Sequence, residues 1–418
     1  MKLTQQGHGP AVGIYIGHGA SHSWTWFADI FDRNGLYTVA FVDERDIAAG
    51  ALEGLQVLFV SGGDTFAIAH GLGSVGAEKI AAFVAGGGVY IGACAGAYLL
   101  LKSSLAPLNM FNFVHARISN LTKNLPAPKA KPEKYCTEYG CRYVFHPVRE
   151  EVVMRMTGSD SAAAQTIIAP LYGGSAMLPS DDIEVMAEYS DFTEKTEFLV
   201  DEAIARKTVL GNVAAARKAY GKGTFYLFGP HFEHPGYTQA NRLLIDIVLQ
   251  CGAGTPRPEL PAETAAGADA VDRKAFRSFM SLISNARIAA LSLERKSFTW
   301  RIGRKVYDPE KIRVFLEAIW SRARLVDSGG GYVYIGKQEM DRLGQLAGAV
   351  LTALRDLPQD TYCSCAEDSE AAHLFGLLRE TTALFLALYF RMKRAGLTEQ
   401  QRRLRCTYTS KQLQSCIR

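Results

Sequence analysis

The clearest candidate for chemistry in this chain is a cysteine between two glycines at the end of an apolar run. Residues 89–91 favour a strand, and Gly92-Ala93-Cys94-Ala95-Gly96 follows with the Gly-x-Cys-x-Gly pattern of a nucleophile elbow. Gly92 and Gly96 would give the clearance that this sharp strand-to-helix turn needs, and the start of the next helix would favour the thiolate of Cys94. The alternative is an unreactive cysteine packed at a strand-helix junction.

A histidine and a glutamate follow a second apolar run. Residues 224–228 predict a strand, and Gly229-Pro230-His231-Phe232-Glu233 comes directly after it. His231 could act as general base toward Cys94, and Glu233 could orient the imidazole, which makes a Cys-His-Glu triad. The alternative is a solvated polar loop that has no role at Cys94.

A glycine pair supplies a third element. Residues 57–60 predict a strand that runs into Ser61-Gly62-Gly63-Asp64. Such a loop can aim backbone N–H groups at an oxyanion, with the N–H of Ala95 as a second donor. An ordinary glycine turn is the alternative.

Taken in order, these motifs resemble the class I glutamine amidotransferase-like superfamily, and more closely the domain at the N-terminus of fungal biotin-protein ligases. The resemblance spans roughly residues 10–250 and is carried by five segments: Ile14-Tyr15-Ile16-Gly17-His18-Gly19, Ser61-Gly62-Gly63-Asp64, Gly92-Ala93-Cys94-Ala95-Gly96-Ala97-Tyr98, Leu171-Tyr172-Gly173-Gly174 and Gly229-Pro230-His231-Phe232-Glu233.

The resemblance implies a flavodoxin-like three-layer α/β sandwich with the elbow at the carboxyl end of a strand. By the same resemblance, Cys94 is the nucleophile, His231 the base and Glu233 the orienting carboxylate, and Gly63 and Ala95 are the oxyanion donors. Four further residues are candidates for oxyanion or substrate contacts: Gly62, Tyr98, Tyr172 and Gly173.

Two departures bear on the substrate. Glutamine-hydrolysing members usually continue the elbow as Gly-x-Cys-x-Gly-x-Gln, whereas Tyr98 stands at the last position here, so free glutamine is not expected. Biotin ligation is not expected either, because the chain has no Gly-Arg-Gly-Arg adenylation loop and Arg301-Ile302-Gly303-Arg304-Lys305 only approximates one.

Strands and helices alternate through the first part, which predicts a parallel sheet with active-site loops at the carboxyl ends of its strands. Expected strands are 12–16, 37–42 and 88–91, and expected helices are 24–33, 77–84 and 95–102. Segments 152–156, 183–189 and 214–220 predict an antiparallel extension, residues 123–134 a lid or surface loop, and residues 241–250 a closing helix.

At 418 residues the chain exceeds the usual size of a single core, so we expect two domains. Residues 1–251 form the amidotransferase-like domain, the Pro/Gly/Ala tract 252–268 is a linker, and residues 269–418 form an all-α helical bundle. Its expected helices are 272–296, 309–323, 337–357, 369–395 and 399–406.

Composition is that of a globular protein, with 48% hydrophobic and 21% charged residues. No apolar run reaches the roughly 18 residues of a membrane span, and residues 1–8 do not resemble a secretory signal. The eight scattered cysteines predict reduced thiols and a cytoplasmic location. The pairs Cys136/Cys141 and Cys363/Cys365 lack the spacing of a zinc knuckle, so neither a metal nor a cofactor is expected.

Charge differs between the halves. From Thr255 onward, 26 Lys and Arg stand against 18 Asp and Glu, a net charge of +8, and the rest of the chain has 20 against 24, a net charge of −4. The clusters Arg391-Met392-Lys393-Arg394 and Arg402-Arg403-Leu404-Arg405 could meet an acidic partner, although a solvated helix face is the favoured interpretation. Nucleic-acid binding is not expected, because no nucleic-acid fold signature accompanies the charge.

Two functions remain open. The first is a Cys-dependent amidase or acyl-transfer hydrolase acting on a small-molecule or peptide amide. The second is a non-catalytic module that keeps the amidotransferase-like fold and uses the pocket to hold a ligand or a partner.

Overall fold

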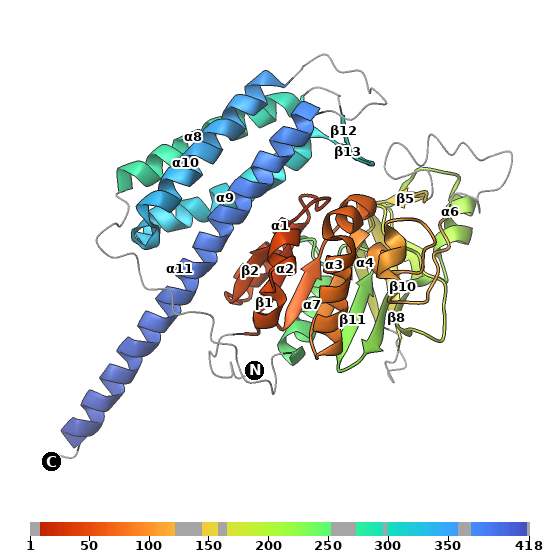
Figure 1. Ribbon diagram of the computed structural model, residues 1–418, viewed down its shortest axis with the longest axis horizontal. Coiled ribbons are helices and arrows are strands. Elements are labelled where there is room, and N and C mark those ends of the chain that lie inside the picture. Colours follow the sequence, from red (N-terminus) through yellow and green to blue (C-terminus); the bar gives the residue numbers. More distant parts are fainter. Residues whose placement is uncertain are drawn as a thin grey trace.

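The computed structural model describes residues 9–121, 144–157, 165–251, 273–295, 299–357 and 369–415, with side chains described up to residue 396. Figure 1 shows a mixed sheet flanked by helices, beside a group of long helices that the last helix, α11, extends beyond. The residues expected to form the lid or surface loop (123–134) and the linker (252–268) lie outside the described ranges, as do both cysteine pairs.

Nine strands form the main sheet, in the order β2-β1-β3-β4-β11-β10-β8-β6-β7. Five neighbouring strands are parallel: β2 (Val39–Val42), β1 (Val12–Tyr15), β3 (Val57–Val60), β4 (Val89–Ala93) and β11 (Gly223–Phe228). The antiparallel strands are β10 (Val213–Tyr220), β8 (Glu184–Phe192), β6 (Glu151–Met156) and β7 (Thr166–Pro170). The predicted parallel sheet and its antiparallel extension are both confirmed.

Helices flank this sheet to give the predicted three-layer α/β fold. They are α1 (Trp24–Arg33), α2 (Glu44–Ala48), α3 (Thr65–Ala85), α4 (Ala95–Leu100), α6 (Glu202–Val209) and α7 (Thr238–Cys251). Short elements complete this part: the 3-10 helices η1 (Ala51–Gly54) and η2 (Leu108–Phe111), and the strand pair β5 (Val148–Arg149) with β9 (Glu197–Phe198).

Helix α3 is longer than the expected helix at 77–84. It begins at Thr65, directly after Asp64, whose Oδ1 accepts hydrogen bonds from the N–H groups of Phe66 and Ala67 at 3.0 and 3.2 Å. The non-helical backbone of Gly73, with φ of 57°, interrupts the helix and breaks the apolar periodicity on which the prediction relied.

The second part is built from α8 (Arg273–Glu294), α9 (Pro309–Gly329), the 3-10 helix η4 (Gly331–Tyr334), α10 (Lys337–Asp356) and α11 (Ser369–Ser415). The two helices expected at 369–395 and 399–406 are one continuous helix. This part was expected to be almost wholly helical, and that expectation was incomplete. The antiparallel strands β12 (Trp300–Ile302) and β13 (Lys305–Tyr307) form a hairpin between α8 and α9.

Helices α9 and α11 attach this second part to the sheet. Arg322 of α9 is buried and donates to Asp32 Oδ2 at 3.0 Å and to Asp29 Oδ1 at 3.3 Å, both on α1. The Tyr389 hydroxyl of α11 donates to Asp32 Oδ1 at 3.0 Å, and the ring of Phe390 lies 6.1 Å from that of Phe41 on β2. The helical part therefore has polar and apolar contacts with the α/β part.

One helical segment, Ser369–Gly396 of α11, is long and apolar enough to cross a membrane by length and composition alone, and a single such helix is weak evidence for a membrane span. The core helix of a soluble protein passes the same test, and 56% of the apolar window is buried inside the molecule. Part of the nearby basic cluster also faces inward, because Arg391 pairs with Glu339 at 2.5 Å and Lys393 lies over the rings of Tyr37 and Tyr389.

Candidate active site

Cys94 occupies a strained turn between β4 and α4. Its backbone has φ of 50° and ψ of −106°, a region that residues other than glycine rarely adopt. A Cβ atom at Gly92 would lie 2.4 Å from the Gly96 carbonyl oxygen, and one at Gly96 would lie 2.1 Å from the Val60 carbonyl oxygen. The turn therefore requires both glycines, which is the geometry predicted for a nucleophile elbow.

The structure brings His231 and Glu233 to the same edge of the sheet as Cys94. Strand β11 pairs with β4 in parallel, so the loops after both strands meet, and the Cys94 N–H donates to the Phe228 carbonyl at 2.9 Å. Nδ1 of His231 lies 2.6 Å from Oε1 of Glu233, with His231 4% exposed and Glu233 fully buried. The His231 N–H also donates to the Pro170 carbonyl at 2.8 Å, which holds the loop in place.

Electrostatics at this edge favour a thiolate beside an imidazolium. Burial alone would raise the pKa of the Cys94 thiol, but the adjacent, hydrogen-bonded His231 and the Lys305 ammonium outweigh it and lower that pKa. For His231, burial opposes the charged ring, yet the Glu233 carboxylate and the Cys94 sulfur together raise the imidazole pKa well above its usual range. Opposite shifts of this kind are the pattern of an activated cysteine.

The proposed oxyanion donors lie beside the sulfur. Gly63 and Ala95 line a cavity together with Cys94, and neither of their N–H groups donates to an acceptor among the described residues. A Cβ atom at Gly63 would lie 2.1 Å from the Gly19 carbonyl oxygen, and one at Gly62 would lie 2.6 Å from Cε1 of His231. Glycine at both positions thus lets this loop approach its neighbours closely.

The remaining predicted contacts surround the cysteine. The Tyr98 hydroxyl accepts a hydrogen bond from Nδ2 of Asn120 at 2.9 Å, and the Tyr172 hydroxyl donates to Oε2 of Glu150 at 3.0 Å. The Tyr172 carbonyl lies 4.0 Å from the Cys94 sulfur, and burial raises the pKa of the Tyr172 phenol above its usual range. Gly173 has φ of 89°, and a side chain there would strike His146.

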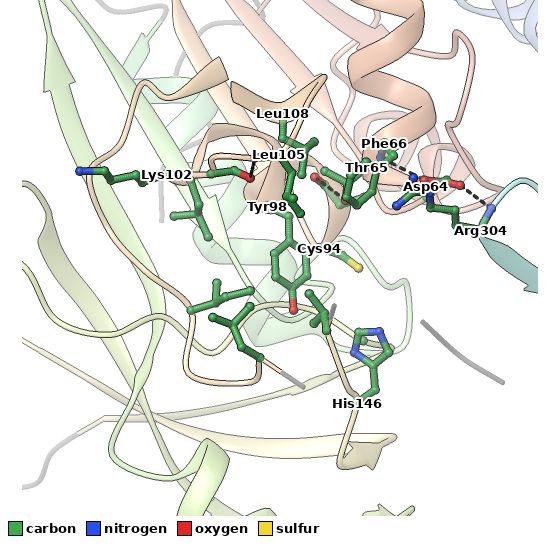
Figure 2. Close-up of a pocket in the computed structure, with 18 of the residues that line it drawn as sticks. Asp64, Thr65, Phe66, Cys94, Tyr98, Lys102, Leu105, Leu108, His146 and Arg304 are labelled. Carbon is green, nitrogen blue, oxygen red and sulfur yellow. Dashed lines mark hydrogen bonds between the residues drawn. The ribbon is translucent and has the colours of Figure 1, made fainter. Parts of the chain in front are cut away.

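Two cavities meet at Cys94. The larger, of about 660 Å³, has apolar walls that include Leu101, Leu105 and Leu108, and Figure 2 shows the Cys94 sulfur and the Tyr98 ring in it, near His146. The smaller, of about 380 Å³, includes Trp26, Tyr172 and His231. Five residues line both cavities: Gly63, Cys94, His146, Gly173 and Lys305. A substrate could therefore extend to both sides of the sulfur.

Sequence reasoning missed two of those five residues. Lys305 comes from the β12–β13 hairpin, which Figure 1 shows between the helical part and the α/β part. Trp300-Arg301-Ile302 and Lys305-Val306-Tyr307 around Gly303 are a hairpin signal, but this segment was considered only as an approximate adenylation loop. His146 follows no motif, so nothing local in the sequence marks it.

No group of three or more His, Cys, Asp or Glu side chains arranged to hold a metal ion occurs within the described ranges. Cys94 and Cys251 are both free thiols.

Comparison with known proteins gives one family match. Residues 11–244, more than half of the chain, match the family described as biotin-protein ligase, N terminal, and the matched range includes Cys94, His231 and Glu233. No curated protein matches the chain.

Three solved structures illustrate what the chain is similar to. A GMP synthase subunit protein from Thermoplasma acidophilum is 14% identical, with a TM-score of 0.37, and the alignment covers 59% of this chain and 96% of that protein. A ThuA-like protein from Bacteroides uniformis is 14% identical, with a TM-score of 0.34 and coverage of 59% and 93%. A β-galactosidase from Bacillus circulans sp. alkalophilus is 12% identical, with a TM-score of 0.34 and coverage of 61% and 33%.

Proposed function

The chain belongs to the biotin-protein ligase N-terminal family, and from that premise we propose that it is a cysteine hydrolase of the amidase or acyl-transfer type. The observation that carries the proposal is the buried His231–Glu233 pair, joined at 2.6 Å, beside a cysteine in a strained elbow. A histidine oriented by a carboxylate and placed next to a nucleophile is the arrangement of a catalytic triad.

In the first half of the reaction, the Cys94 thiolate adds to the substrate carbonyl carbon. The carbonyl electron pair moves onto oxygen, and the N–H groups of Gly63 and Ala95 stabilise the resulting oxyanion. The imidazolium of His231 then gives its proton to the departing amine as the C–N bond breaks. The products are a free amine and a thioester on Cys94.

In the second half, neutral His231 takes a proton from water as the water oxygen adds to the thioester carbonyl. Collapse of this intermediate breaks the C–S bond, and the acid product leaves while Cys94 and His231 return to the ion pair. An amine that replaces the water would complete an acyl transfer. Glu233 stabilises the imidazolium in both halves.

The proposed substrate is a small-molecule or peptide amide other than free glutamine. The two cavities beside Cys94 have room for substituents on both sides of a scissile bond. Tyr98 stands where glutamine-hydrolysing relatives have Gln, and its ring lies in the larger cavity. That cavity has apolar walls, which fit a substrate less polar than glutamine.

A binding module is the second candidate, and one observation favours it. Cys94 is only 2% exposed, and the β12–β13 hairpin from the helical part lies against the site, as expected of a pocket that encloses a ligand. In that case Cys94 would hold a ligand or partner and form no covalent intermediate.

Reaction with a p-nitrophenyl ester of a short fatty acid separates the two candidates. We expect a burst of p-nitrophenol and an intact-protein mass increase of one acyl group, located on Cys94. Cys94→Ser abolishes both, while Cys251→Ser leaves them unchanged because Cys251 lies in α7, away from the described cavities. Absence of a burst and of any adduct on Cys94 in the folded wild type would favour the binding module.

A cytoplasmic location and an acidic partner for the basic helical part are also proposed, from the scattered cysteines and the net charge of +8 after Thr255.

A further inference from the structure

We infer that the β12–β13 hairpin completes the site and that Lys305 binds a carboxylate of the substrate. The substrate is then an amide that has a carboxylate close to the scissile bond and an apolar group as the rest of the molecule. This inference rests on the proposed function and adds its substrate class. It assigns a specificity role to a segment that lies outside the matched residues 11–244.

The hairpin is held at both ends. At its base, the rings of Trp300 and Tyr307 are buried and lie 6.2 and 4.7 Å from the ring of Phe375 on α11. At its tip, Gly303 has φ of 59° and occupies the first position of the two-residue turn. The Arg304 N–H donates to Oδ2 of Asp64 at 2.7 Å, so the tip is joined to the residue that caps α3.

Asp64 is the residue directly after Gly63, so this contact places the hairpin beside the proposed oxyanion donor (Figure 2). The Arg304 guanidinium is already engaged, since it lies 3.7 Å from the centre of the Phe66 ring. Lys305, the next residue, lines both cavities. The hairpin thus presents Lys305 to the space around Cys94.

Among the residues that the structure describes, the Lys305 ammonium has no counter-ion. Within the described residues, no carboxylate lies in hydrogen-bond or ion-pair distance of it, although it is only partly exposed. Its charge reaches Cys94 and the neighbouring His146, because it contributes to lowering the pKa of both groups. A half-buried cation at a reactive centre is stabilised by an anionic ligand.

The carboxylates that line the same cavities have other partners, and none of them is paired with Lys305. Glu150 accepts from the Tyr172 hydroxyl, and Asp308 pairs with Lys311. Glu310 pairs with Arg313, and Asp64 is held by the N-terminus of α3 and by Arg304. A ligand carboxylate is the partner that the proposal assigns to Lys305.

His146 adds a neutral neighbour. It is 5% exposed, and burial together with the Lys305 and Arg149 cations lowers its pKa to about 3, so the ring carries no charge at neutral pH. Lys305 beside a neutral imidazole fits a single carboxylate, while Arg149 lies over the Tyr172 ring and Lys311 pairs with Asp308. The apolar walls of the larger cavity, which include Leu101, Leu105 and Leu108, suit the remainder of the substrate.

Two alkylating probes of nearly equal size test the inference on the intact protein. Iodoacetamide is neutral and iodoacetate carries a carboxylate, and in each case the thiolate forms a bond to the CH2 carbon and displaces iodide, which leaves a carbamidomethyl or a carboxymethyl group on sulfur. We measure both rate constants at Cys94 and take their ratio, because a change in thiolate fraction affects both rates equally. Relative to N-acetylcysteine, the wild-type ratio should favour iodoacetate by about tenfold, because the Lys305 ammonium attracts the carboxylate in a partly screened site.

Lys305→Met keeps the length of the side chain and removes its charge, so the iodoacetate preference should disappear, while Lys305→Arg retains most of it. Lys79→Met is the matched control, since Lys79 is exposed on α3 and lines neither cavity. Arg304→Met distinguishes the contribution of Arg304 from that of Lys305, and the iodoacetate preference should remain in this variant. Melting temperatures verify that each variant is folded.

A second experiment measures how well an added ligand protects Cys94 from alkylation. Hexanoate should slow iodoacetamide alkylation of Cys94 more than hexanamide does, and this difference should vanish in Lys305→Met. Equal protection by hexanoate and inorganic phosphate would contradict the assignment of a carboxylate with an apolar body.

The failures of the two proposals are distinguishable. Fast iodoacetamide labelling of Cys94 without any iodoacetate preference overturns the carboxylate receptor and leaves the hydrolase intact. A preference that survives in Lys305→Met overturns the role of that residue. Iodoacetamide labelling of Cys94 no faster than that of the other thiols contradicts the proposed function itself.

Discussion

Replacement of His231 by alanine tests whether this imidazole activates Cys94. Burial raises the thiol pKa, and His231 is the main group that opposes burial. Without the ring, the burial effect and the negative charge of Glu233 both remain, and both raise the pKa of the thiol. The sign is therefore fixed: His231→Ala raises the Cys94 pKa.

The magnitude follows from the contact that is lost. A hydrogen bond to a charged group contributes about 1.5–3 kcal/mol, and one pKa unit corresponds to about 1.4 kcal/mol, so the thiol pKa should rise by about 1–2 units. Because the reactive thiolate fraction falls as the thiol pKa rises, alkylation at a pH below that pKa should slow by about 10–100-fold. The limiting rate at high pH should change little, because the same thiolate reacts.

The assay is the pH dependence of iodoacetamide alkylation at Cys94. His234→Ala is the matched control: His234 lies in the same loop, packed on Trp26 at 4.6 Å, but burial lowers its pKa to about 4, so it carries no charge that could stabilise the thiolate. An unchanged pH profile in His231→Ala, or an equal shift in His234→Ala, would refute the reasoning.

Three further predictions concern groups around the site. Glu233→Gln removes the carboxylate that raises the His231 pKa, so the ring should titrate at lower pH in histidine NMR spectra; an unaltered titration contradicts this. Gly96→Ala places a methyl group 2.1 Å from a backbone carbonyl oxygen of β3, so it should lower the free energy of unfolding in urea by about 1–3 kcal/mol. The control is Gly348→Ala in α10, where no atom lies within 4 Å of the added methyl group, and it should raise that free energy by about 0.5–1 kcal/mol. Asp64→Asn keeps an N-cap for α3 but removes the charged acceptor for the hairpin tip. The iodoacetate preference at Cys94 should therefore fall, while the free energy of unfolding changes by less than about 1 kcal/mol. A preference equal to that of the wild type would count against docking through Asp64.

Sequence patterns predicted the elements of the α/β part well wherever apolar periodicity was uninterrupted. The helix expected at 24–33 is α1 (Trp24–Arg33), and the strand and helix around Cys94 differ from their expected limits by one or two residues. Prediction failed at Gly73, where a break inside α3 hid its first half. Local periodicity reports burial on a continuous element and is lost where a glycine interrupts it.

The proximity of Cys94, His231 and Glu233 was predictable because the segments that carry them follow strands, and parallel strands end at one edge of the sheet. The position of Lys305 was not, since it depends on the docking of the hairpin through Arg304 onto Asp64, which precedes Arg304 by 240 positions. The hairpin strands have only three residues each, too short to stand out between two long helices. His146 likewise reaches the site through tertiary packing that no short motif records.

The most direct test of the account is competitive labelling of all eight cysteines with a limiting amount of iodoacetamide at neutral pH, read by peptide mass spectrometry. We predict that Cys94 is labelled first although it is only 2% exposed, because its thiol pKa is lowered and two cavities reach its sulfur. Preferential labelling of an exposed thiol, with Cys94 left unmodified in the folded protein, would contradict the claim that these groups form an activated nucleophile.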